Sequence, residues 1–457
     1  MSNTDAPNVR SENVMGVMSV HKLLLSMAIP MMISMMVQAL YNVVDSIFVA
    51  QLSENALTAV SLAFPVQNLM ISVGVGTGVG INAFLSKSLG EKDFESVNKS
   101  AANGIFLAWA GCAAFMLIGF FLSEAFFRTQ TDIREIVRYG QDYMFIVCVC
   151  SFAMFNQTVL ERLLMSTGKT FYAMISQTVG AMVNIALDPV LIFGLFGFPR
   201  LEVAGAAWAT VAGQVLAALV AFYFNLRKNH EIHIRFKGFR PSGAIIRRIY
   251  AVGFPTILMM SVGSVMTYGL NLILISFTAT ATAVFGVFFR LQSFLFLPVF
   301  GITNAMVPIL AYNFGARKKN RILKAIRLSV IYAVGIMVVG TSLFELYPAK
   351  LFSLFNATPA MLAIGVPAFR IMCSTFPFAG FCVVAASVFQ ALGSGIESLI
   401  VSVTRQLVVL LPAAWLLSLT GTLGAVWWSF PIAECVTLAM SAYFLKRAYD
   451  NKIKIIA

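Results

Sequence analysis

Stretches of about twenty consecutive apolar residues recur along this chain, and they constrain its fold more than any other feature. A helix of that length crosses a ~30 Å hydrocarbon core. Because lipid offers no hydrogen-bond partners, each stretch must satisfy its own backbone polar groups, as a helix does. Charged residues make up only 11% of the sequence, whereas soluble domains carry about 25%. The chain is therefore predicted to be an all-α polytopic membrane protein.

The hydropathy pattern predicts twelve transmembrane helices. Their expected ranges are 20–50, 56–86, 100–122, 137–160, 170–196, 203–226, 245–276, 280–312, 322–345, 360–390, 396–418 and 422–446. The first twenty residues are polar and contain no apolar core of a cleaved signal peptide. The first span is therefore expected to direct insertion itself.

The net charge of +13 is distributed unevenly between the two sides of this predicted topology. Basic residues concentrate in alternate loops: Lys87, Lys92 and Lys99, Arg162 and Lys169, Arg227 to Arg248, Arg317 to Arg327, and Lys446 to Lys454. This positive-inside pattern places both termini in the cytoplasm. It favours a basic surface facing anionic lipid over a nucleic-acid partner.

A basic linker divides the chain into two halves of six predicted spans. The expected organisation is an N-terminal tail 1–19, a first lobe 20–226, a linker 227–244, a second lobe 245–446 and a C-terminal tail 447–457. An offset of 225 positions aligns Pro30 with Pro255, and Gly90 with Gly315. Because six is even, the repeats are parallel, with a pseudo-two-fold axis along the membrane normal. Transporters built this way bind substrate between the lobes and rock one against the other.

The segment "NIALDPVLIFG" places Asp188 and Pro189 inside the fifth span. Ionisable residues within a membrane are functional candidates. A helix rises about 1.5 Å per residue. Measured from the preceding basic residue at the cytoplasmic end of each span, this rise places Asp45 and Asp188 in the outer half of the membrane, both in the first lobe. Asn184 lies one turn before Asp188, and Thr210 lies near the outer end of the sixth span. These residues predict a coupling site for H+ or Na+.

Two further interpretations concern the same segment. Pro189 frees a backbone carbonyl and gives the fifth span a point at which to bend. Protonation of Asp188 would then shift the equilibrium between a straight and a bent conformation of this helix. Alternatively, Asp188 caps a broken helix or pairs with a buried arginine.

In the second lobe, Glu434 is either a counter-ion of the substrate or the structural partner of an arginine.

An amphipathic substrate cavity is expected between the lobes, because methionine and aromatic surfaces adapt to many shapes. The candidates are Met31, Met35, Gln38, Tyr41, Asn42, Phe64, Gln67, Asn68, Phe289, Arg290 and Gln292. Glu161 and Arg162 are placed at the cytoplasmic end of the fourth span. We find no nucleotide-binding glycine loop and no cysteine or histidine pattern typical of a metal site, so transport without ATP or a cofactor is expected.

Several motifs together make the chain resemble the multidrug and toxic compound extrusion (MATE) family, in its bacterial MepA-type branch near the DinF-like transporters. They are "ALYNVVDSIFVAQLSENALTAVSLAFP", "ERLLMSTGKT", "NIALDPVLIFG", "GAAWAT" and "YNFGARK". The resemblance covers nearly the whole chain. The sequence departs from the branch that uses acidic residues in spans seven and ten. Span seven has no acidic residue, and span ten has Arg370 but no carboxylate.

The resemblance implies a V-shaped pair of six-helix lobes in the bacterial cytoplasmic membrane, working as a monomer and not as an enzyme. It implies export of lipophilic cationic drugs or dyes in exchange for H+ or Na+. It also implies cation-site roles for Asp45, Asn184, Asp188 and Thr210, with the backbone near Ala206. The alternatives are a lipid-linked precursor flippase of the same superfamily, which would favour a basic central cavity, and a channel or membrane scaffold.

Overall fold

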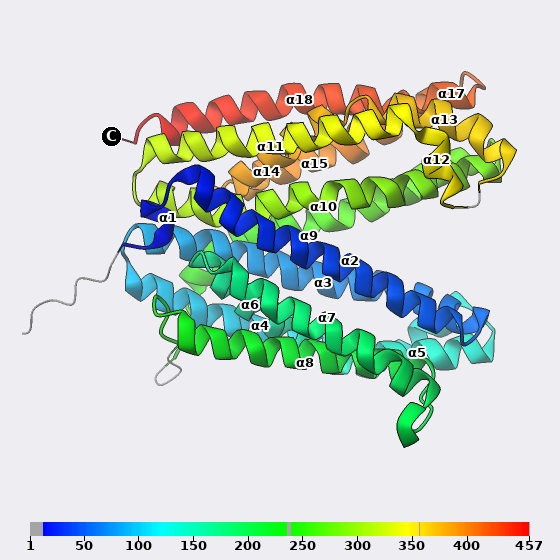
Figure 1. Cartoon of the computed structure of the whole chain (residues 1–457), viewed down its shortest axis with the longest axis horizontal. Helices are drawn as coiled ribbons and strands as arrows, with labels where there is room; N and C mark the ends of the chain where they lie inside the picture. The colour runs from blue at the N-terminus through cyan, green and yellow to red at the C-terminus, as the bar shows by residue number, and fades with distance from the viewer. Residues whose placement is uncertain (1–11, 235–238, 356, 457) are drawn as a thin grey trace, which may run out of the picture.

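The computed structural model describes residues 12–234, 239–355 and 357–456, and within these ranges every regular element is a helix (Figure 1). Residues 1–11 of the expected N-terminal tail and 235–238 of the expected linker lie outside the described residues.

The first bundle contains α1 (Val14–Val17), α2 (Val20–Ala50), α3 (Glu54–Gly90), α4 (Phe94–Gln130), α5 (Arg134–Val149), α6 (Phe152–Ser166), α7 (Thr170–Phe193), the short η1 (Leu195–Gly197) and α8 (Val203–Lys228). The second contains α9 (Gly243–Ile275), α10 (Ala279–Gly315), α11 (Lys319–Leu346), α12 (Pro348–Ser353), α13 (Pro359–Cys373), α14 (Phe376–Ala391), α15 (Gly395–Val403), the π-helix η2 (Thr404–Leu410), α16 (Leu411–Ser418), α17 (Leu423–Val426), α18 (Ser429–Ala448) and η3 (Tyr449–Ile453).

Within the described ranges, ten helical stretches are long and apolar enough to cross a membrane, and two bent pairs bring the number to twelve. The pairs are α5 with α6, bent by 45°, and α13 with α14, bent by 49°. The prediction of twelve spans is confirmed on this count, although spans four and ten are broken instead of continuous. The break before α14 coincides with Pro377, which lacks a backbone N–H and is favoured in the first turn of a helix.

The two bundles repeat the same backbone at the 225-residue offset. α3 and α10 each contain 37 residues, and they begin at 54 and 279. The turns that follow contain the only matched pair of left-handed non-glycine residues among those described, Lys92 with φ 61° and Arg317 with φ 57°. The breaks in the bent pairs, at 150–151 and 374–375, fall within one residue of this offset too.

We call the end that holds residues 229–234 and 239–242 the linker end, and the opposite one the far end. At the linker end, glycines let the two bundles touch through their backbones. A methyl group on Gly90 of α3 would lie 2.0 Å from the carbonyl oxygen of Tyr312, and one on Gly315 of α10 would lie 2.1 Å from that of Lys87. At the far end α12 and α13 stand apart from α5, which gives the molecule the expected V shape (Figure 1).

The N-terminal segment Glu12–Ser19 joins the two bundles at the linker end. Asn13 donates hydrogen bonds to the carbonyl oxygen of Thr167, at 3.1 Å, and to Glu231, at 3.0 Å. From the second bundle, Arg321 donates to the carbonyl oxygen of Met15 at 3.0 Å, and Lys318 pairs with Glu12. Met15 is fully buried, so this segment is part of the contact between the bundles.

Candidate functional site

Close packing of α7 on α8 brings the polar residues of the first bundle together. A methyl group on Gly213 of α8 would lie 2.6 Å from the carbonyl oxygen of Gly180 on α7, so only glycine permits this approach. One turn further along α7, Asn184 donates from Nδ2 to Oγ1 of Thr210 at 3.2 Å. Ala206, fully buried, lies one turn before Thr210 on α8.

Asp188 is the most deeply buried carboxylate of this cluster. Its side chain is 0% exposed, and neither of its oxygens has a hydrogen-bond partner among the described residues. Oδ1 of Asn184 and, on the adjoining helix α2, Oδ1 of Asp45 are likewise buried without a partner there. Buried polar atoms are almost always hydrogen-bonded. These acceptor oxygens therefore form a group that would accept a proton or a hard cation.

Asp188 neither caps a broken helix nor pairs with a buried arginine among the residues described. α7 continues through Asp188 and Pro189 to Phe193, so the carboxylate does not cap a broken helix. Over the residues described, no arginine or lysine forms an ion pair with Asp188 or Asp45. The charge of the carboxylates is therefore not offset by a basic side chain, as a site that binds and releases a cation would need.

A cavity of about 500 Å³ adjoins this cluster on the linker-end side. Asn184 and Thr210 belong to its wall, and four of the predicted cavity residues line it: Met31, Met35, Gln38 and Tyr41. The other predicted residues are not part of its wall and lie nearer the far ends of their helices: Asn42 on α2, Phe64, Gln67 and Asn68 on α3, and Phe289, Arg290 and Gln292 on α10. Their role in substrate binding stays a prediction.

The floor of the cavity, the part of its wall nearest the linker end, contains polar residues that were not among those predicted to line it. Glu161 of α6 accepts hydrogen bonds from Gln157 and Ser176, both at 3.1 Å. Gln177 donates to Gln38 at 2.9 Å. Glu161 and Arg162 lie in the second half of α6, toward the linker end, and they line the cavity because it extends to this helix. The polar pair Gln157 and Glu161, four residues apart on one helical face, was the available signal.

In the second bundle, Glu434 is the structural partner of an arginine. Its Oε1 lies 2.9 Å from Nε of Arg405, as the structural alternative for this residue predicts. A second pair, Arg370 with Glu345, has its nearest charged atoms 4.0 Å apart and is largely exposed. No cluster of three or more potential metal ligands occurs in the ranges described, and their cysteines are free thiols.

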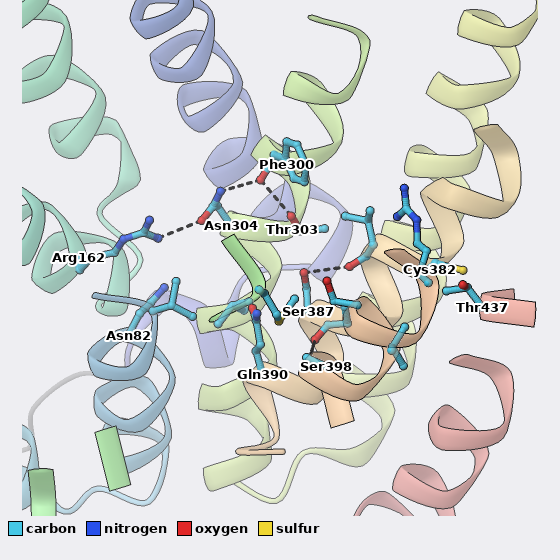
Figure 2. A pocket seen from close by; sticks show the side chains of 18 residues that line it. Asn82, Arg162, Phe300, Thr303, Asn304, Cys382, Ser387, Gln390, Ser398 and Thr437 are labelled. Carbon is cyan, nitrogen blue, oxygen red and sulfur yellow. Dashed lines mark hydrogen bonds between the residues drawn. The ribbon is translucent and has the colours of Figure 1, made fainter. Parts of the chain in front are cut away.

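A second, smaller pocket of about 220 Å³ is lined mostly by helices of the second bundle, with Val79, Asn82 and Arg162 from the first (Figure 2). It shares Arg162, Phe300 and Asn304 with the first cavity. Nη1 of Arg162 donates to Oδ1 of Asn304 at 3.0 Å, so the walls of the two spaces meet at a contact between the two bundles.

Comparison with known proteins agrees with this architecture. The family described as MatE matches residues 30–190 and again residues 255–416, two segments that begin at the same 225-residue offset. The chain is 26% identical over 438 residues to a multidrug export protein MepA of Staphylococcus haemolyticus, covering 96% of this chain and 95% of that protein.

Two other similarities are relevant to function. An FAD transporter of Shewanella oneidensis is 26% identical over 437 residues, covering 95% of this chain and 96% of the relative. The solved outward-facing structure of a multidrug resistance MATE transporter of the MOP superfamily superposes with a TM-score of 0.89 at 25% identity, covering 97% of this chain and 99% of that one.

Proposed function

Since the chain belongs to the MatE family of membrane transporters, we propose that it is a multidrug efflux antiporter. It exports lipophilic organic cations in exchange for H+ or Na+, by alternating access between the two lobes. It works as a monomer in a bacterial cytoplasmic membrane, with both termini in the cytoplasm and without ATP or a nucleic-acid partner. Relatives named as multidrug export proteins over nearly the whole chain support this proposal.

The observation that carries the proposal is the uncompensated carboxylate of Asp188 beside the cavity. Burial without a partner costs free energy, and binding a proton or Na+ would recover it. Asn184, one helical turn from Asp188, and its partner Thr210 also line the cavity, so the carboxylate lies next to the substrate space. A cation in the cluster and a cationic drug in the cavity would repel each other, which is the basis of exchange.

The lining of the cavity suits a cation of variable shape. Met31 and Met35 offer adaptable thioether surfaces, and Tyr41 offers a ring for cation–π contact worth ~0.5–2 kcal/mol. Glu161 supplies a carboxylate, while Arg162 is directed to Asn304. Alternating access requires the linker-end contacts to open while the far end closes, since substrate must reach the cavity from each side in turn.

The test is efflux of an ethidium-like dye from inverted vesicles under imposed proton or sodium gradients. Asp188→Asn and Asp45→Asn should each abolish gradient-driven efflux, because neither amide binds a proton or replaces the lost charge. The exposed loop variant Asp132→Asn is the matched control and should transport normally. Normal efflux by both cluster variants at normal expression would remove this site from the mechanism.

The flippase alternative makes a different prediction for ligand preference. A lipid-linked precursor presents phosphate groups, so a flippase would bind a matched organic anion in the main cavity more tightly than the dye. Competition for dye binding between cations and size-matched anions distinguishes the two functions, and a cation preference supports the antiporter.

A further inference from the structure

We propose that the smaller pocket is a separate anion site, which binds a small organic anion carrying carboxylate or phosphate groups. It lies between the bundles and is distinct from the cavity to which we assign cationic drugs (Figure 2). This inference does not depend on the coupling site, because none of the four cation-cluster residues Asp45, Asn184, Asp188 and Thr210 lines the pocket.

The charge of the pocket wall differs from that of the main cavity. Its lining includes two arginines, Arg162 and Arg405, and no carboxylate side chain. Arg405 is already paired with Glu434, so its charge is largely offset. For Arg162, no carboxylate oxygen lies within 4.0 Å in the part of the chain that the structure describes. Its side-chain acceptor Asn304 is neutral, and the carboxylate of the adjacent Glu161 accepts hydrogen bonds from Gln157 and Ser176 instead of pairing with it.

The neutral wall residues add hydrogen-bond donors to this charge. Asn82 lies beside Ser166 and Ser86, whose hydroxyls have closer acceptors in the carbonyl oxygens of Arg162, at 2.6 Å, and Ser166, at 2.9 Å, so the Asn82 amide belongs to this network. Oγ of Ser402 accepts from Gln406 at 3.1 Å, so its own proton is available to donate. Donors around an unpaired guanidinium match a carboxylate or phosphate, because such bonds are charge-assisted and arginine binds these groups in a bidentate manner.

The size and position of the pocket define its ligand further. Its 220 Å³ is smaller than the ~300–1,000 Å³ of pockets that enclose drug-sized molecules, so it fits a small anion. Asn82 and Arg162 come from the first bundle, whereas Ser402 and Arg405 come from the second. An anion held by both would stabilise the arrangement in which the bundles are in contact here.

The experiment measures binding of inorganic phosphate and of citrate to the purified full-length transporter by calorimetry, at constant ionic strength in chloride. We expect saturable binding of at least one probe. Arg162→Gln should weaken it at least tenfold. Arg405→Gln combined with Glu434→Gln removes both charges of the buried pair together and should weaken it less. Arg370→Gln, which removes an arginine that lines neither space, is the matched control and should change the affinity less than twofold.

A monodisperse size-exclusion profile and an unchanged circular dichroism spectrum check that each variant is folded, because Arg162 also lines the dye cavity. Protein that binds dye but neither anion would overturn the proposal, as would an Arg162→Gln variant that binds the anion as tightly as the unmodified chain. Asp188→Asn separates this proposal from the antiport mechanism. It should abolish gradient-driven efflux and leave the anion affinity unchanged, so failure of one proposal does not imply failure of the other.

Discussion

The backbone contact between α3 and α10 predicts that Gly90→Ala and Gly315→Ala would each open the linker end. The added methyl groups would lie 2.0 Å from the oxygen of Tyr312 and 2.1 Å from that of Lys87. Carbon and carbonyl oxygen normally approach to ~3.3–3.6 Å, so each contact must lengthen by more than ~1 Å. Both obstacles are backbone atoms, which cannot rotate away. The bundles themselves must separate.

The shift in the equilibrium between a closed and an open linker end depends on the strain that the added methyl group causes in the closed arrangement. Overpacking of this kind costs ~1–3 kcal/mol, and it acts only while the two backbones are in contact. The gain in helix propensity from glycine to alanine is present in both arrangements and cancels. Because 1.4 kcal/mol is a factor of ten, each variant should shift the equilibrium away from the closed linker end by ~5- to ~150-fold.

The assay is electron–electron distance measurement between spin labels at the exposed residues Glu95 on α4 and Lys324 on α11, in a cysteine-free background. Both variants should move the distribution toward longer distances. The control is Gly335→Ala on α11, where a methyl group meets nothing within 4 Å, and its distribution should match that of the unmodified chain. Identical distributions for Gly90→Ala and Gly335→Ala would show that this contact does not keep the linker end closed.

Two further predictions concern α7 and the N-terminal segment. Pro189→Ala should leave dye affinity intact and lower the gradient-driven transport rate, because it restores a backbone donor and stiffens the helix beside Asp188; an unchanged rate would reduce the proline to a structural role. The hydrogen bond and charge of Lys318 lower the pKa of Glu12 below its ordinary 4.5, so this contact stabilises the segment above that value and is lost as the pH falls through the lowered pKa. The protection factors of residues 12–18, which correct hydrogen exchange for its intrinsic pH dependence, should therefore fall in acid, and Glu12→Gln should remove that change.

Local patterns in the sequence were sufficient for the span number, the 225-residue repeat and the cluster around Asp188. Each depends on helical spacing or on landmarks such as Gly90 and Gly315, which can be read along the chain. The bends in spans four and ten were not predictable in this way, because hydropathy averages over a window longer than the break. The composition of the cavity floor was also missed, since it depends on how far the bundles separate around α6.

The partner of Glu434 illustrates the same limit. The chain contains several intramembrane arginines, and depth along a helix does not decide which of them meets the carboxylate. The contact with Arg405 lies where α18 packs on the π-helix η2, and hydropathy does not reveal such a local change in helix geometry.

The backbone of the two bundles repeats, but the carboxylates proposed for coupling, Asp45 and Asp188, do not. At the 225-residue offset, Leu270 and Ala413 stand where the first bundle has Asp45 and Asp188. A transporter with one such site that admits one monovalent ion for each monovalent drug expelled moves no net charge. The membrane voltage then contributes nothing, and the ion's concentration ratio alone sets the limit of drug accumulation. A divalent drug would leave against the voltage, at a cost of ~2.3 kcal/mol per 100 mV, which lowers that limit about fifty-fold.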